Sequence, residues 1–440
     1  MGDLPVYFEQ RPVGVVKVDC KGPAFTYDRT WLSTRGAFPI STTMPLGPDP
    51  FGPAVFLPWA ANLLPESEQL RAVGQFLGMS PNDVVGLLAE IGRDTAGALS
   101  IGKPGGTSSV YWRPVETEAE LERVIVELPS KPFLVGEEGV SMSLAGVQSK
   151  LAVGVDDNGR ICVPTVGSPS THILKPDSER LPGGVHNEAF CLTLAKRLGL
   201  ATVEIATGKS GKRAFLLVKR YDRVGGGGRW RRLHQEDFCQ ALGKLPSAKY
   251  EANQTGVAGP TLAEMFNLTR RLMAPTDVLR LLDMAIFNII ACNTDAHAKN
   301  YSIMITAGGN SLAPLYDVMC GQPWRHVTKN LAQRIAGKNR GDELTGKDWH
   351  RFARECGLGA RQVIARVRAL AQSAIAETRA AIADVAAMPA GAHPILAEVQ
   401  ASIERRARTL LAQLDEAKEG AAAGESTLAA AEHINEQVPA

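Results

Sequence analysis

Residues 293–300 read Asn-Thr-Asp-Ala-His-Ala-Lys-Asn, and residues 311–317 read Ser-Leu-Ala-Pro-Leu-Tyr-Asp. Between them, the strand-like residues 301–305 and a Gly-Gly-Asn turn at 308–310 predict a β-hairpin. Before them, residues 275–291 are apolar nearly all round, which is typical of a buried central helix. A buried helix therefore leads into a polar loop with Asp295 and Asn300, and the second strand of the hairpin ends at Asp317.

Protein kinases need this order of parts. Asp295 would accept or orient the proton of an attacking hydroxyl. Asn300 offers a neutral oxygen and Asp317 an anionic one, and both suit Mg²⁺. His297 or Lys299 could offset charge on the transferring phosphoryl group. Asp and Asn also favour plain turns, but the buried helix, the hairpin and the terminal aspartate coincide here, which favours the kinase interpretation.

A lysine in an apolar strand supplies a second element of a nucleotide site. Lys175 lies within His-Ile-Leu-Lys-Pro at 172–176. A strand lysine is seldom fully buried without an anionic partner, and Glu188 on the following predicted helix is placed to orient it. The alternative is an edge-strand lysine whose ammonium group reaches solvent.

Two further segments are weaker candidates for binding a nucleotide. Residues 143–150, Ser-Leu-Ala-Gly-Val-Gln-Ser-Lys, are expected between two strands, where Gly146 would let the backbone approach a phosphate; a plain hairpin is the alternative. Residues 219–222, Lys-Arg-Tyr-Asp, end a strand where a kinase hinge would present backbone groups to adenine. The alternative is an edge strand that finishes in a charged turn.

Composition limits the remaining classes of protein. The chain has 440 residues and a formal charge of +2, so no strong overall field marks nucleic acid or membrane as a partner. Its seven cysteines form no CxxC pair, which disfavours zinc ribbons and disulfide frameworks. The first residues lack the layout of a signal peptide, and no apolar run is long enough to span a bilayer. We expect a soluble cytoplasmic protein.

The chain divides into four predicted regions. Residues 1–138 form a mixed amino-terminal subdomain, in which a helix is expected from residue 62 onward. Residues 139–235 are rich in strands and end near a flexible link at Gly225–Gly228. Residues 236–418 are mostly helical, and residues 419–440 are expected to be a flexible tail.

Together these segments resemble the HipA family, the serine/threonine-protein kinase toxins of type II toxin–antitoxin systems. The resemblance runs in order over about residues 5 to 410 and includes the motifs above. It also includes Asn187-Glu188, Tyr221-Asp222-Arg223, Gln235-Glu-Asp237 and the amino-terminal stretches 62–66 and 90–98. Each motif is weak alone, and their order makes the set specific.

The resemblance implies an α+β, two-lobed, lipid-kinase-like fold with an extra amino-terminal α/β subdomain and a mostly helical carboxy-terminal lobe. It implies ATP and Mg²⁺ as cofactors, Asp295 as the catalytic aspartate, Asn300 and Asp317 as metal ligands, and Ser143 as an inhibitory autophosphorylation site. The positions that match its ATP-binding residues are Ala145, Gly146, Val147, Gln148, Ser149, Lys150, Lys175, Lys219, Arg220, Tyr221, His297, Lys299, Asn300, Tyr316 and Asp317. Ser149 departs from the acidic residue that is commoner in the family.

The resemblance also implies partners. The substrate would be an aminoacyl-tRNA synthetase, with the glutamyl enzyme as the first candidate, and its phosphorylation would inhibit growth and promote persistence. A helix-turn-helix antitoxin dimer, similar to HipB, would bind the chain and carry it to operator DNA as a corepressor. No membrane partner is expected. Two alternatives stay open: a small-molecule phosphotransferase that uses the same Asp-Asn-Asp site, and a non-enzymatic scaffold that only binds the antitoxin.

Overall fold

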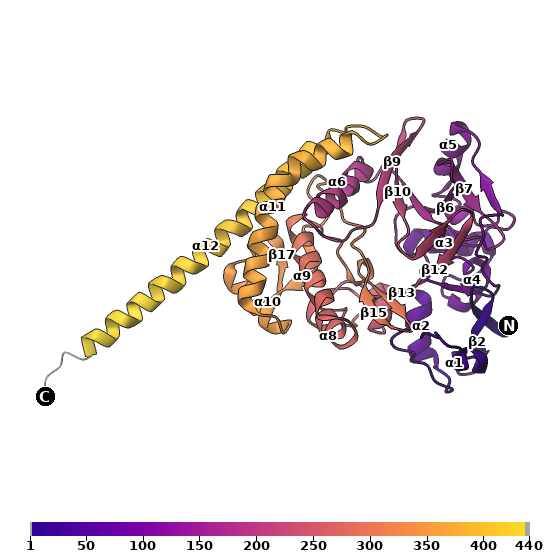
Figure 1. Cartoon of the computed structure of the whole chain (residues 1–440), viewed down its shortest axis with the longest axis horizontal. Coiled ribbons are helices and arrows are strands. Elements are labelled where there is room, and N and C mark those ends of the chain that lie inside the picture. The colour runs from indigo at the N-terminus through magenta and orange to yellow at the C-terminus, as the bar shows by residue number, and fades with distance from the viewer. Residues whose placement is uncertain (1, 436–440) are drawn as a thin grey trace.

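The computed structural model describes the backbone of residues 2–435 and the side chains of residues 2–415. Its amino-terminal part contains a four-stranded antiparallel sheet in the order β3-β2-β1-β4 (Figure 1). The strands are β1 Leu4–Phe8, β2 Arg11–Asp19, β3 Gly22–Tyr27 and β4 Leu99–Ile101. Four helices lie between β3 and β4 in the chain: α1 Arg29–Ser33, α2 Pro53–Ala61, α3 Ser67–Leu77 and α4 Val84–Ile91. Buried aromatic side chains, among them Phe25, Phe56 and Trp59, fill the core of this part.

The predicted helix start at residue 62 is wrong. α2 ends at Ala61, and the next residue, Asn62, caps it: the side-chain amide of Asn62 donates to the carbonyl of Pro58 at 2.7 Å. Residues 62–66 are a connecting segment, and α3 begins only at Ser67. Within this segment Pro65 pairs in an isolated β-bridge with Gly146, far along the chain.

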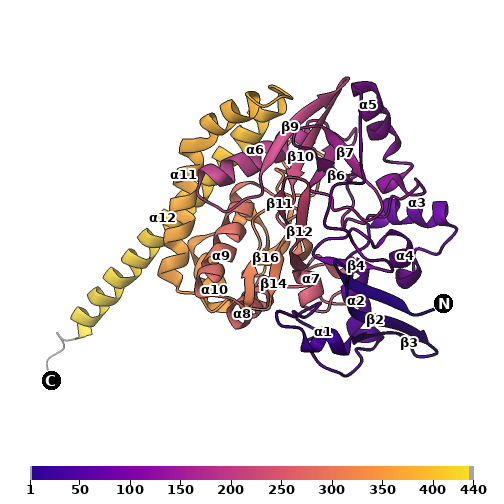
Figure 2. The same ribbon diagram turned by 45° about the vertical axis from the view of Figure 1, so that its right-hand side comes forward.

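A six-stranded sheet in the order β5-β7-β6-β8-β10-β9 lies between the amino-terminal part and the carboxy-terminal helices (Figure 2). Its strands are β5 Trp112–Pro114, β6 Leu151–Val155, β7 Ile161–Pro164, β8 His172–Pro176, β9 Ile205–Ser210 and β10 Arg213–Lys219. α5 Glu118–Glu127 and α6 Gly184–Arg197 accompany it. Because β5 pairs with β7, the sheet begins well before residue 139, where we placed the domain boundary.

Two local expectations in this region are also corrected. No strand directly precedes the loop at 143–150, because the six-stranded sheet resumes only at Leu151. Residues 141–147 hydrogen-bond to the amino-terminal part instead. The four glycines at 225–228 are not a flexible link. They close a hairpin between β11 Arg223–Gly226 and β12 Arg229–Arg232, because Gly227 and Gly228 adopt the positive φ angles, 56° and 78°, that such a turn requires.

The carboxy-terminal part combines helices with short hairpins. β13 His234–Asp237, β14 Ser302–Thr306 and β15 Gly309–Leu312 form one sheet, and β16 Asn330–Ile335 pairs with β17 Lys338–Arg340. The helices are α7 Phe238–Ala241, α8 Leu262–Leu272, α9 Pro275–Ile290, α10 Gly346–Glu355, α11 Ala360–Ala386 and α12 Ile395–Asn435. α9 is largely buried, as predicted, and it leads into the polar loop before β14. None of the described helices could cross a membrane.

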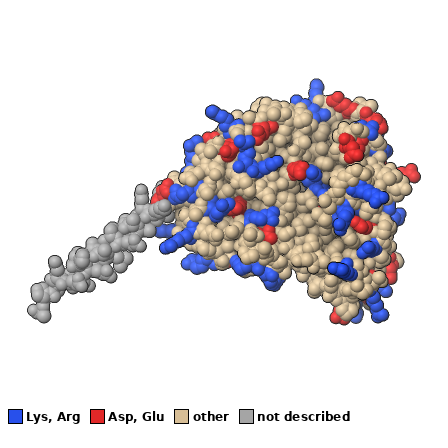
Figure 3. Space-filling model, in the orientation of Figure 1, with Lys and Arg blue, Asp and Glu red and all other residues tan. Residues whose placement is uncertain are grey.

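Helix α12 extends away from the body of the protein (Figure 1). Its backbone continues to Asn435, past residue 418, so the expected flexible tail is helical as far as that residue. Alanine-rich sequence favours this outcome because alanine has the highest intrinsic helix propensity. Residues 436–440 lie outside the described residues. On the face in Figure 3, basic and acidic side chains are interspersed, in keeping with a net charge of only +2.

Candidate active site

Lys175 is the centre of a buried ion cluster that joins three elements. Its Nζ atom on β8 lies 2.8 Å from Glu188 Oε1 on α6 and 2.6 Å from Asp317 Oδ1 after β15. β8 is an interior strand between β6 and β10, so the lysine cannot reach solvent from a sheet edge. Burial alone would lower the pKa of Lys175, but the two carboxylates outweigh it and hold that pKa above its usual value. The sequence-predicted pair of Lys175 and Glu188 is therefore brought together, with Asp317 added.

Asp317 is held in an uncommon backbone conformation. Its φ angle is 57°, in the left-handed region that residues other than glycine seldom adopt. Burial would raise the pKa of its carboxyl group, but Lys175 and Lys150 outweigh that effect and keep this pKa below its usual range. The side chain is 32% exposed, so an ionised carboxylate oxygen stays accessible beside the lysine. Backbone strain of this kind is found most often at functional sites.

The loop after α9 presents Asp295 and Asn300 side by side. Asn300 lies in the 3₁₀ turn Ala298–Asn300, and its side-chain amide donates to the backbone carbonyl of Asp295 at 2.8 Å. The amide of Asp295 donates to Asn293 Oδ1 at 3.0 Å, which fixes the loop from its other end. Because the nitrogen of the Asn300 side chain is engaged, its oxygen is the atom left to meet a metal ion. The Asp295 carboxylate is 58% exposed, as a group that meets a substrate must be.

Tyr250 is a contact of Asp295 that the sequence did not reveal. Its hydroxyl donates to Asp295 Oδ1, and its ring meets the His297 ring edge to face, with centroids 5.1 Å apart. The preceding residue, Lys249, forms an ion pair with Glu66 at 2.8 Å. Tyr250 lies 45 residues before Asp295 in the chain, in a segment without any recognisable motif, so no sequence signal points to it.

His297 is buried beside Asp295. Its Nε2 atom lies 3.8 Å from Asp295 Oδ1, and its Nδ1 atom is buried without a hydrogen-bond partner among the described residues. Burial, reinforced by the nearby Lys249, lowers the pKa of His297 well below its usual value, so the imidazole is neutral at neutral pH. It can therefore serve as a hydrogen-bonding group but not as the cation that would offset phosphoryl charge.

Lys299 does not face the candidate nucleotide site, which corrects its predicted role. Its Nζ atom lies 2.6 Å from Asn62 Oδ1, 3.2 Å from the Asn62 carbonyl and 2.9 Å from Asp237 Oδ2. These three acceptors use all three ammonium donors. Burial alone would lower the pKa of Lys299, but Asp237 and Glu66 hold it above its usual value. The lysine ties the catalytic loop to the amino-terminal part.

The hinge segment offers its backbone rather than its charged side chains. Lys219 forms a surface ion pair with Glu204 at 3.0 Å, and the buried Arg220 binds Asp222, so neither side chain is available to a nucleotide. The amide of Tyr221 has no hydrogen-bond partner among the described residues. The Tyr221 ring stacks on Tyr316 with centroids 5.7 Å apart, which provides an aromatic surface beside that amide.

The loop at 143–150 reaches the same region. Lys150 donates to the Ala145 carbonyl, and Gly146 has a φ of 106° with its would-be Cβ only 2.7 Å from Lys150 Nζ, so this position requires glycine. Burial, together with the nearby Lys175, lowers the pKa of Lys150 to about 8. Ser143 is fully buried, and Val147 is exposed. Gln148 and Ser149 are partly exposed, and their side chains make no hydrogen bond within the described part of the chain.

Comparison with known proteins identifies the family. The HipA-like C-terminal domain matches residues 142–379, which is more than half of the chain, and the HipA N-terminal domain matches residues 4–102. The chain belongs to the HipA family. The resemblance seen in the sequence is confirmed, and with it the α+β kinase-like fold.

Relatives within the HipA family match over most of this chain. Y4mE of Sinorhizobium fredii is 38% identical over 84% of this chain and 89% of its own. The serine/threonine-protein kinase toxin HipA of Shewanella oneidensis is 31% identical over 76% of this chain and 78% of its own. A solved structure of the Shewanella oneidensis HipA, HipB and operator DNA complex aligns with a TM-score of 0.81 and 27% identity, over 94% of this chain and 99% of that one.

The residues of this HipA-family chain fit a magnesium nucleotide. Asp317 supplies an ionised oxygen and Asn300 a neutral one, which are the ligand types that Mg²⁺ takes alongside phosphate oxygens. Lys175 and Lys150 supply positive charge near them, and Nδ1 of His297 is a buried polar atom with no hydrogen-bond partner in the described part of the chain. The arrangement can hold a polyphosphate and present a carboxylate to a hydroxyl group.

Proposed function

We propose that this chain is the toxin of a type II toxin–antitoxin system and acts as a serine/threonine-protein kinase that uses Mg²⁺ and ATP. The observation that carries the proposal is the bonding of Lys175 to both Glu188 and Asp317. Beside it, the exposed Asp295 carboxylate lies in a loop that is held by the buried Asn300. The buried charges of Lys175 and Glu188 cost desolvation energy, and a nucleotide site gives them and the partly exposed Asp317 a use. Membership of a kinase-toxin family supports the same conclusion.

Each group then has a defined task in phosphoryl transfer. Asp295 orients the acceptor hydroxyl and accepts its proton, with Oδ1 held by Tyr250 and Oδ2 directed to the substrate. Lys175 and the backbone of residues 145–150 bind the phosphates, and the Tyr221 amide receives the adenine. Asn300 and Asp317 would hold Mg²⁺, which when bound neutralises charge on the phosphates. Catalysis then consists of positioning and electrostatic stabilisation.

We further propose that the protein substrate is an aminoacyl-tRNA synthetase, the glutamyl enzyme first, so that phosphorylation inhibits growth and promotes persistence. Ser143 is the proposed autophosphorylation site. Phosphate there adds roughly −1.5 to −2 charges and cannot fit where the serine is now buried, so the loop would have to leave its place and the enzyme would lose ATP binding.

A helix-turn-helix antitoxin is the proposed partner, and the complex would act as a cytoplasmic corepressor at operator DNA. The related Shewanella oneidensis HipA has been solved with HipB and operator DNA, which supports this proposal. A chain with net charge +2 is poorly suited to the many phosphate contacts that drive DNA affinity, so the antitoxin would supply them. A titration with operator DNA, with and without the antitoxin, tests this, and tight binding by the chain alone would contradict it.

The central experiment is phosphoryl transfer by the Asp295→Asn variant. The change removes one charge with little change in volume, so we expect loss of transfer with ATP binding retained. Asp157→Asn is the matched control, because that aspartate is exposed in a surface turn. Mass spectrometry on the same samples should find phosphate on Ser143 in the active protein and none in Asp295→Asn. Wild-type transfer by Asp295→Asn would refute the kinase assignment of this loop.

A further inference from the structure

The loop of residues 141–149 hydrogen-bonds to the amino-terminal domain, residues 4–102, and not to the sheet that carries it. At its start, the Ser143 hydroxyl donates to the Leu63 carbonyl at 2.7 Å. The Ser143 amide donates to the Asp94 carbonyl at 3.0 Å, and the Asp94 amide donates back to the Ser141 carbonyl at 3.2 Å. Ser143 is fully buried by these contacts.

The middle of the loop is held from the same side. The Glu66 amide donates to the Gly146 carbonyl at 3.2 Å, and Gln69 Nε2 donates to the Val147 carbonyl at 2.7 Å. Gln69 is itself only 5% exposed. Within the described residues, the remaining hydrogen bonds of the loop also reach the amino-terminal domain, apart from the one between Lys150 and Ala145. The loop, which leads directly to Lys150 near Lys175, thus depends on another domain for its position.

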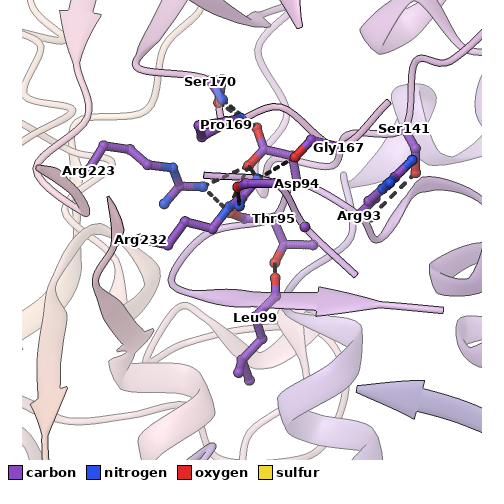
Figure 4. Close-up of polar contacts among 12 residues, drawn as sticks. Arg93, Asp94, Thr95, Leu99, Ser141, Gly167, Pro169, Ser170, Arg223 and Arg232 are labelled. Atoms are coloured by element: carbon purple, nitrogen blue, oxygen red, sulfur yellow. Dashed lines mark hydrogen bonds and ion pairs between the residues drawn. The ribbon is translucent and has the colours of Figure 1, made fainter. Parts of the chain in front are cut away.

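Asp94 is itself fixed to the kinase domain by a buried ion cluster (Figure 4). Its carboxylate lies 2.8 Å from Arg223 and 3.4 Å from Arg232, and it accepts from the Ser170 hydroxyl at 2.6 Å. Burial would raise the pKa of Asp94, but the three arginines that surround it, Arg220, Arg223 and Arg232, keep this pKa below its usual range. Arg223 directly follows the hinge, so Asp94 joins the hinge and the start of the loop.

We propose that residues 62–69 and Asp94 are positioning residues that hold the phosphate-binding loop closed, so that the amino-terminal domain sets the affinity of the kinase for ATP. The proposal rests on the proposed function in one respect, namely that this loop binds phosphate. A loop that is already in place pays less conformational entropy when the nucleotide binds, and each lost contact lowers the fraction of molecules ready to bind. Opening of the same contacts would expose Ser143.

The test compares Gln69→Met with Gln75→Met. Gln69→Met keeps the side-chain volume but removes the donor to Val147, whereas Gln75 lies exposed on the same helix, α3, and makes no side-chain hydrogen bond within the described chain. Loss of one such bond should open the loop about fivefold more often. In the nucleotide-free protein, amides of residues 141–150 should then exchange hydrogen about fivefold faster. The KM for ATP should rise with kcat unchanged, by at most the same factor, because KM scales inversely with the fraction of molecules whose loop is closed. Gln75→Met should match the wild type.

The outcomes separate this proposal from the proposed function. Faster loop exchange together with a higher KM for ATP supports both. Faster exchange that saturating ATP and Mg²⁺ do not slow supports the positioning role and overturns the assignment of this loop to phosphate binding. Faster exchange in a protein whose wild type uses no ATP supports the positioning role and overturns the proposed function. Unchanged loop exchange in Gln69→Met, with the variant as thermally stable as Gln75→Met, overturns the positioning role whatever the KM does.

Discussion

Lys175 and Lys299 are both buried lysines beside the candidate active site, with exposed fractions of 7% and 6%, yet they belong to different regions. Lys175 bonds to Glu188 and Asp317, so both of these partners lie within the HipA-like C-terminal domain, residues 142–379. Lys299 bonds to Asp237 and to Asn62 of the amino-terminal domain. The difference teaches that closeness to a catalytic motif does not give a lysine its role. Its bonding partners do: they favour the proposed nucleotide site for Lys175, and they place Lys299 at the junction between the domains.

The largest expected effect comes from Lys175→Met. Loss of a preorganised charge beside a transferring phosphoryl group typically costs about 100-fold or more in kcat. We therefore expect transfer to fall by at least that factor, and the rise in thermal midpoint caused by ATP and Mg²⁺ to shrink. Lys209→Met, at an exposed lysine on β9, is the control. An active Lys175→Met variant would break the comparison, because it would remove the distinction between the two lysines.

Lys299→Met should instead act on stability. Removing one partner of a buried ion pair leaves an uncompensated charge, here on Asp237, which should cost roughly 3 kcal/mol in the free energy of unfolding. Urea denaturation of the full chain measures this change. At a temperature where the variant is folded, its kcat should exceed that of Lys175→Met by at least an order of magnitude. A stable but inactive Lys299→Met protein would contradict the structural role.

Tyr250→Phe probes the segment that joins the two regions, since Lys249 pairs with Glu66 and Tyr250 with Asp295. A hydrogen bond to a charged group is worth about 1.5–3 kcal/mol, so its loss should lower kcat by roughly tenfold or more. The KM for ATP should stay the same because Tyr250 orients only the carboxylate. Tyr111→Phe, at an exposed tyrosine, controls for the lost hydroxyl. An unchanged kcat would show that Asp295 needs no such partner.

The smallest expected effect concerns a carboxylate at the domain junction that has no basic partner among the residues whose side chains are described. Glu236 is buried and accepts from the Ser41 hydroxyl and the Thr42 amide, and burial raises its pKa to about 7. The native state therefore binds more protons than the unfolded state between about pH 5 and pH 7, and this group makes the protein less stable as the pH rises through that range.

Glu236→Gln removes this titration. The advantage of the variant in thermal midpoint should therefore grow from about pH 5 to about pH 8. The matched control is Glu343→Gln, at an exposed position. A difference that does not change with pH would mean that Glu236 stays ionised in the folded protein.

The sequence analysis predicted those features of the site and fold that depend on the order of motifs along the chain. Asp295, Asn300 and Asp317 could be proposed as one site because a buried helix and a hairpin place them a short distance apart in the chain; their roles remain predictions. Lys175 and Glu188 could be paired because a strand leads directly into the helix that carries the glutamate. The family and the kinase-like fold followed from the same ordered motifs and are confirmed by the match to both HipA domains.

The sequence could not predict contacts between distant segments. Lys299 lies within the motif of residues 293–300. Only its contact with Asn62, 237 residues away in the chain, shows that it bonds to the amino-terminal domain. Tyr250, Glu66 and Gln69 have no pattern of their own, because each acquires its role through one tertiary contact. The glycines at 225–228 show a related limit: their composition suggests a flexible segment, whereas the positive φ angles of Gly225, Gly227 and Gly228 fit a defined turn.

Strand β5 limits how the chain could be divided into fragments. Its residue Trp112 lies flat against Gly154 of β6, where a Cβ atom would stand 2.5 Å from the indole. In the same connecting region, Glu118 accepts the amide of Gly211 at 2.8 Å, at the tip of the β9–β10 hairpin. A fragment that began at residue 139 would lose both contacts and leave β7 as a bare sheet edge, which invites aggregation. A kinase fragment must therefore begin before Trp112, and the shortest soluble piece is longer than the catalytic residues alone would suggest.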